Sequence, residues 1–131
     1  MTPLRRLDHV AVLVGDTDRA LEYFSGHLGL SVTSSEVIEV PHVRLTYLDA
    51  GVAFVQLVEP LDPDSPLAEQ LAEHGEGLHH IAFAVDDVAT SAAALAAPGA
   101  PPVTLGSGRG RASAFVPGDP RHGVRVEVTQ A

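Results

Sequence analysis

The sequence predicts an α+β fold of two paired modules, each with the element order β-α-β-β-β. The first observation is a repeat, because residues 7–16 reappear in altered form as residues 78–87. A shift of 71 residues makes Leu, His, Ala, Val and Asp coincide and pairs His9 with His80. The same shift pairs Gln56 with Glu127, and all four residues lie in apolar, strand-like runs. Such self-similarity is typical of a duplicated unit.

The first module is expected over about residues 5–60. Residues 7–14 are nearly all apolar and include β-branched side chains, which indicates a strand. Apolar residues at helical spacing then predict a helix that begins near Thr17 and ends at Gly29. The remaining strands of this module are predicted at 30–38, 43–48 and 53–58.

A linker with a short helix is expected at residues 61–76, because Ser65 can cap a helix that has Pro66 in its first turn. The second module is expected over about residues 77–131, and the chain as a whole is interpreted as a single domain, 1–131. Its elements are predicted as a strand at 78–85, an alanine-rich helix at 88–97, a strand at 103–105, a glycine-rich loop at 106–110, and strands at 112–116 and 123–129.

Composition excludes several classes of protein. The formal net charge of −9 argues against binding to duplex nucleic acid, which needs a basic face. No apolar stretch is long enough to span a bilayer, and the first apolar run is broken by Gly15-Asp16, so we expect a cytoplasmic protein without a signal peptide. The chain has no cysteine, and any metal would therefore be held by imidazole, carboxylate or amide groups.

The four polar residues paired by the 71-residue shift predict a metal site. Taken alone, a histidine inside a strand is more often a hydrogen-bonded structural residue than a ligand. Burying the Glu127 carboxylate without a partner costs several kcal/mol, however, so this residue needs a cation, a donor or solvent. His9, His80, Gln56 and Glu127 together would form a mixed nitrogen and oxygen site for a divalent ion such as Co, Ni, Zn, Mn or Fe.

The other histidines and the glycine-rich loop have simpler interpretations. His79 alternates with His80 and should point to the opposite face of its strand. The glycine-rich loop carries Arg109 and could bind phosphate, but no helix follows it, so a plain loop is favoured. Exposed positions near turns are expected for His27, His74 and His122.

Four segments together resemble the vicinal oxygen chelate superfamily, and within it the methylmalonyl-CoA epimerases. They are Leu7-Asp8-His9-Val10-Ala11-Val12, Gln56-Leu57-Val58-Glu59-Pro60, Glu76-Gly77-Leu78-His79-His80 and His122-Gly123-Val124-Arg125-Val126-Glu127-Val128. The resemblance implies that the modules form an incomplete barrel around one metal ion, cobalt above all, held by His9, Gln56, His80 and Glu127. It also implies a homodimer that binds an acyl-CoA and exchanges the α-proton between two metal-bound oxygens of its malonyl group.

The resemblance further implies a catalytic glutamate shortly before the third strand. The corresponding run is Glu39-Val40-Pro41-His42-Val43, which places the acid/base on Glu39. Pro41-His42 departs from the usual Gln-Gly, which leaves the acyl group of the substrate open. Glu127 is the expected second acid/base on the opposite face of the substrate. If Glu39 is the base, desolvation should raise its pKa toward neutrality.

Three other classes remain alternatives. Glyoxalase I-like isomerases use the same scaffold but usually carry Glu at the position of Gln56. Iron-dependent ring-cleaving dioxygenases need two histidines and one carboxylate, which His9, His80 and Glu127 could supply. A metal-free binding or resistance module of the same fold is less favoured, because such modules lose the ligands that this chain retains.

Overall fold

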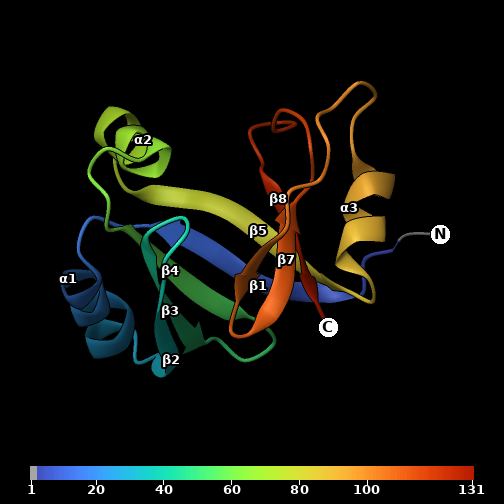
Figure 1. The fold of residues 1–131 in the computed structure, drawn as a ribbon. Coiled ribbons are helices and arrows are strands. Elements are labelled where there is room, and N and C mark those ends of the chain that lie inside the picture. The colour runs from blue at the N-terminus through green and yellow to red at the C-terminus, as the bar shows by residue number, and fades with distance from the viewer. Residues whose placement is uncertain (1–2) are drawn as a thin grey trace. The chain divides into compact units, whose positions relative to one another are not determined.

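The computed structural model describes residues 3–131, in which eight strands, three α-helices and one π-helix alternate (Figure 1). This combination of helices and strands confirms the expected α+β class. The elements are β1 (Arg6–Leu13), α1 (Thr17–Leu21), η1 (Glu22–His27), β2 (Ser31–Ile38), β3 (Val43–Asp49), β4 (Phe54–Pro60), α2 (Pro66–His74), β5 (Gly77–Val85), α3 (Val88–Leu95), β6 (Gly106–Gly108), β7 (Arg111–Phe115) and β8 (Val126–Gln130). None of the helices within residues 3–131 has the length and apolar character needed to cross a membrane.

By its contacts the chain separates into two compact units. One is Val10–His79, and the other combines the described residues up to His9 with His80–Ala131. The boundary therefore falls inside β1, between the two residues His9 and Val10, and inside β5, between His79 and His80.

In the unit Val10–His79, β2, β3 and β4 form an antiparallel sheet with a regular register along β3 and β4. The backbone N–H of Val14, just after β1, donates to the carbonyl of Val58 on β4. One apolar cluster includes Leu45 and Val58 and is covered by Leu67 and Leu71 of α2. A second cluster, centred on Leu48 and Leu57, packs against the segment of α1 and η1.

The predicted helix in this unit has the expected extent but two different hydrogen-bonding patterns. Asp16 caps the start of α1 by accepting a hydrogen bond from the Arg19 backbone N–H at 3.2 Å. The chain then widens into the π-helix η1, where the Leu28 N–H donates to the carbonyl of Tyr23 at 2.8 Å, five residues earlier. Gly29 ends the helical segment at a φ of 81°, as predicted for a glycine C-cap.

In the other unit, β5 pairs in parallel with β8, and β8, β7 and β6 continue the sheet antiparallel. Figure 1 shows α3 alongside β7 and β8, the two strands that it contacts. Its small side chains Ser91 and Ala92 are buried, which agrees with the close approach expected of an alanine-rich helix. Val85, Val88, Ala114 and Val128 complete this core with Ala92.

The closing segment differs from the prediction at two points. No strand is present at 103–105, and β6 lies instead in the predicted glycine-rich loop. A two-residue turn, Arg109 and Gly110, with φ values of 54° and 70°, joins β6 to β7 as a hairpin. The residues of β6 are Gly-Ser-Gly, which has no apolar alternation, and glycine is depleted in strands. The sequence therefore carries no signal for this strand.

Candidate metal site

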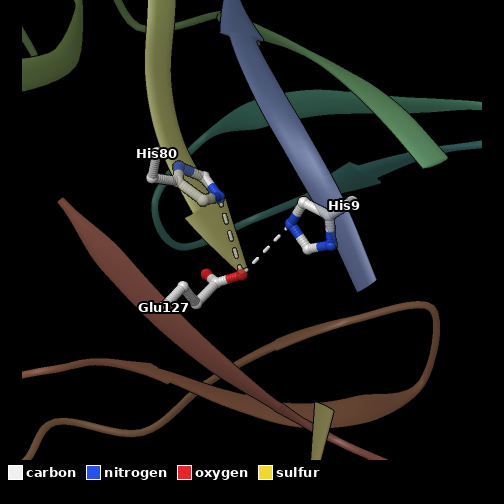
Figure 2. A group of neighbouring side chains, drawn as sticks. All are labelled: His9, His80 and Glu127. Atoms are coloured by element: carbon white, nitrogen blue, oxygen red, sulfur yellow. Dashed lines mark ion pairs between the residues drawn. The ribbon is translucent and has the colours of Figure 1, made fainter. Parts of the chain in front are cut away.

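Three of the four paired polar residues meet in the unit that contains His80–Ala131. Figure 2 shows His9 from β1, His80 from β5 and Glu127 from β8 pointing toward one another. One ligand atom from each lies within 4.8 Å of the others. Glu127 Oε1 is 3.3 Å from His9 Nε2 and 3.6 Å from His80 Nε2. The parallel pairing of β5 and β8 sets Glu127 opposite Ala82, two residues beyond His80 and hence on the same face of the strand.

All three side chains are largely withdrawn from water. The side chains of His9 and Glu127 are 2% and 12% exposed, and His80 is buried. Burial alone would raise the pKa of the Glu127 carboxyl, but the adjacent imidazoles of His80 and His9 outweigh burial and lower this pKa to about 2. Glu127 is therefore ionised at neutral pH.

His9 has a second carboxylate on its other side. Its Nδ1 lies 2.7 Å from Asp8 Oδ2, and Arg109 donates a charged hydrogen bond to the same oxygen. Burial raises the pKa of Asp8, but the hydrogen bond from His9 and the charge of Arg109 outweigh it and lower the pKa. Burial lowers the pKa of His9, but the hydrogen bond to Asp8 and the nearby Glu127 carboxylate outweigh burial, so this pKa is raised.

Sequence reasoning missed both Asp8 and Arg109 as parts of the site. One signal was available for Asp8, which is an acidic residue directly beside a candidate ligand in an otherwise apolar strand. Arg109 gave no comparable signal, because 101 residues separate it from Asp8. Only the β6–β7 hairpin brings the two together.

Aromatic contacts fix the second histidine ring. Phe115 on β7 meets His80 edge-on, with ring centroids 5.0 Å apart and planes at 90°. The His9 and His80 rings also lie edge to face, with centroids 5.5 Å apart. These contacts leave His80 little freedom to rotate its Nε2 away from Glu127.

Gln56 belongs to the other unit, and its role as a ligand stays a prediction. It lies on β4 directly opposite Tyr47 on β3, and its amide nitrogen donates to the Tyr47 hydroxyl at 2.7 Å. The amide oxygen is buried and accepts no hydrogen bond from residues 3–131. The amide therefore presents an acceptor, which is the orientation that a metal ligand requires.

Glu39 lies in the turn between β2 and β3, as expected, but it is exposed to solvent. The desolvation expected of a general base is therefore not present in this structure, and the catalytic role of Glu39 stays a prediction.

His79 is half-buried beside His80 on β5. The exposure predicted for the remaining histidines near turns is confirmed for His27, His74 and His122.

The donor set of His9, His80 and Glu127 fits a divalent metal ion. Two ligand atoms held about 2.1 Å from one ion at ordinary coordination angles lie roughly 3.0–3.4 Å apart. The separations of 3.3 and 3.6 Å from Glu127 Oε1 to the two imidazole nitrogens are close to this range. The carboxylate on His9 Nδ1 is the partner that metal-bound imidazoles usually have.

A family model described as the Glyoxalase/Bleomycin resistance protein/Dioxygenase superfamily matches residues 8–116. The chain belongs to this superfamily, which is the vicinal oxygen chelate family that the sequence segments resemble. Metal-binding members of this fold family hold a divalent ion, and within residues 3–131 His9, His80 and Glu127 are grouped so that they could do so.

Several relatives that are similar in sequence to this chain are named as epimerases. The chain is 35% identical to the human mitochondrial methylmalonyl-CoA epimerase over 88 residues, 65% of this chain and 49% of that protein. It is 31% identical to the ethylmalonyl-CoA/methylmalonyl-CoA epimerase of Cereibacter sphaeroides over 104 residues, 79% of this chain and 76% of that protein.

A solved structure extends the likeness to nearly the whole chain. A variant of the Streptomyces coelicolor methylmalonyl-CoA epimerase, in complex with 2-nitronate-propionyl-CoA, superposes with a TM-score of 0.84 at 34% identity. The superposition covers 98% of this chain and 95% of the Streptomyces chain. Among the curated relatives, however, the chain spans only about half the length of the mammalian epimerases it matches.

Proposed function

We propose that the chain is a metal-dependent epimerase that acts on an acyl-CoA of the methylmalonyl-CoA type. The observation that carries the proposal is the buried group of two imidazoles and one ionised carboxylate, His9, His80 and Glu127. The similarity to named methylmalonyl-CoA epimerases supports the choice of reaction and substrate. We also propose a homodimer, which is what the family resemblance of the sequence segments implies and which sedimentation can test.

The proposed ligands are His9, Gln56, His80 and Glu127. The place of Gln56 rests on the 71-residue relation to Glu127, and the Tyr47 hydroxyl supports it by holding the amide with its oxygen unpaired. The set contains nitrogen and oxygen donors only and one formal negative charge. Such a set accepts Co, Ni, Zn, Mn or Fe, and Co is proposed first on the family resemblance of the sequence.

The reaction requires removal of a weakly acidic proton between a thioester and a carboxylate. A divalent ion at this site would supply positive charge beside the substrate oxygens as that proton leaves. Glu39 is the proposed base on one face, and substrate binding must shield it from the solvent that now surrounds it. Glu127 is the proposed acid/base on the other face. Its low pKa means that it begins the cycle ionised, so the proton added to the α-carbon on that face would come from solvent water at this carboxylate.

Exchange of the substrate α-proton tests the proposal directly. Methylmalonyl-CoA is incubated with the protein in deuterated water, and deuterium at the α-carbon is followed by NMR. We expect rapid exchange with cobalt and slow exchange after the metal is removed with a chelator. Exchange no faster than in protein-free buffer, with the metal shown to be bound, would contradict the proposal.

One observation favours a second candidate, an iron-dependent ring-cleaving dioxygenase. Two histidines and one carboxylate, the set that such enzymes use, are the three residues grouped in one unit. Oxygen uptake with a catechol after loading with ferrous iron would support this alternative. A protein that exchanges the α-proton of methylmalonyl-CoA and consumes no oxygen would exclude it.

A further inference from the structure

The His9 ring is held from the side that does not face Glu127. Its Nδ1 hydrogen bonds to Asp8 Oδ2 at 2.7 Å, while Nε2 lies 3.3 Å from Glu127 Oε1. A carboxylate can only accept, so Nδ1 carries the hydrogen in this contact. The contact thereby sets the plane of the ring and leaves Nε2 as the nitrogen available to a ligand.

Asp8 needs an anchor of its own, because its side chain is only 4% exposed and is adjacent to His9 in the chain. Arg109 provides that anchor by donating from its guanidinium to the same oxygen, Oδ2, that accepts from His9. The contact joins two segments that lie 101 residues apart in the sequence. The orientation of the Asp8 carboxylate is therefore set by the β6–β7 hairpin as well as by β1.

The backbone at Arg109 indicates that this side chain has a use. Arg109 has a φ of 54°, in the left-handed region that glycine occupies without penalty and that a side chain disfavours. The following residue in the turn, Gly110, also has a positive φ, of 70°. At Arg109 the guanidinium reaches inward to Asp8, with 16% of its side chain exposed.

We propose that Arg109 is a positioning residue, which holds Asp8 and through it the His9 ring so that Nε2 faces His80 and Glu127. The inference rests on the proposed metal site, and it makes a prediction whose sign is opposite to that of simple electrostatics. By simple electrostatics, removing the positive charge of Arg109 should strengthen metal binding, because it removes the Coulomb repulsion between the guanidinium and the metal ion. Loss of a positioning residue should weaken it.

The test measures the affinity of the metal-free protein for cobalt by calorimetry, with Arg109→Ala compared with the wild type. Losing the direct partner of a metal ligand usually lowers affinity about 10–100-fold, and we expect a fall of up to this size, because Asp8 is no longer held against His9 without Arg109. Arg109→Lys should restore part of the affinity, because it keeps the charge but not the planar geometry of the guanidinium. Arg111→Ala is the matched control, since Arg111 is exposed at the start of β7 on the same hairpin.

The visible absorption spectrum of bound cobalt gives a second readout that reports ligand geometry. It should change in Arg109→Ala and stay as in the wild type in Arg111→Ala. If Arg109→Ala does not fold, Arg109→Met keeps most of the side-chain volume and is judged by the same two measurements. Equal or tighter cobalt binding with an unchanged spectrum would overturn the inference alone. A wild-type protein that binds no cobalt would overturn the proposed site and, with it, this inference.

Discussion

The buried group around Glu127 and the exposed turn around Glu39 differ in how far the protein alone fixes their side chains. His9 and Glu127 are 2% and 12% exposed, and hydrogen bonds and ring contacts hold the group in place. Glu39 lies between β2 and β3 with its side chain in solvent. The comparison indicates that the geometry of the proposed metal site is formed before a substrate arrives, whereas the proposed base would depend on the substrate to exclude water.

The largest effect should come from His80→Ala, which removes one of the buried donors. We expect metal content to fall from about one ion per chain to background, because the remaining donors no longer enclose an ion. The stabilisation that metal gives the wild type should disappear with it. Metal analysis and melting curves with and without cobalt check both effects.

His79→Ala is the control for this change, because His79 neighbours His80 on β5 but is not in the buried group. It should keep its metal. Unchanged metal content in His80→Ala would remove the central claim of the site.

The second effect separates the chemistry from the metal. Glu39→Gln keeps the size and polarity of the side chain but cannot accept the proton, so α-proton exchange should fall about 10²–10⁴-fold. Metal content and melting temperature should remain those of the wild type, because the residue is exposed. Glu22→Gln, at an exposed position on η1, is the matched control and should retain full exchange.

Two results would revise this assignment. Near-full exchange in Glu39→Gln would show that Glu39 is a surface carboxylate without a catalytic role. Glu36 and His42 would then be the next candidates for the base. Loss of metal in the same variant would make Glu39 a ligand and contradict the four-residue site.

A third prediction concerns pH in the metal-free protein. The pKa of Glu127 in the folded protein, about 2, lies below its ordinary 4.5, so its stabilisation is present above pH 4.5 and is lost as pH falls toward 2. The pKa of His9 is raised above 6.5, so its stabilisation is present below pH 6.5 and is lost as pH rises through the raised value. The free energy of unfolding should therefore be greatest between about pH 4.5 and 6.5.

Bound metal should reverse the alkaline side of this profile, because the imidazole must be deprotonated to bind it. Melting temperatures measured from acid to alkaline pH, with and without cobalt, should diverge increasingly as pH rises. A metal-free protein whose melting temperature is flat from pH 6 to pH 9 would contradict the contribution of His9.

The smallest effect is expected at Tyr47, whose hydroxyl accepts the hydrogen bond from the Gln56 amide. Tyr47→Phe leaves that buried N–H without its partner and should lower the free energy of unfolding by about 1–3 kcal/mol. It should also weaken cobalt binding, because the amide can then rotate its oxygen away. Denaturant titration and calorimetry measure the two effects.

Tyr23→Phe makes the same chemical change at a residue that is 53% exposed and should alter neither quantity. Cobalt affinity equal to that of the wild type in Tyr47→Phe would show that this hydroxyl does not orient a metal ligand.

The sequence by itself determined the α+β class, most strand positions and the family, because apolar periodicity, the 71-residue repeat and the family motifs are all patterns in the order of the residues. It also singled out His9, His80 and Glu127, three polar residues that lie together in the structure. It missed β6, because Gly-Ser-Gly has no apolar alternation, and it did not reveal that the predicted helix changes to π geometry at Glu22.

Only the tertiary structure decided how the His9 ring is supported. Asp8 and Arg109 meet across 101 residues, because a two-residue turn with positive φ values directs the arginine toward β1. The exposure of Glu39 was likewise beyond the sequence, since a carboxylate in a turn can be buried or exposed depending on what packs over it. Local patterns determine which side chains can form a site, whereas contacts between distant segments determine how those side chains are held.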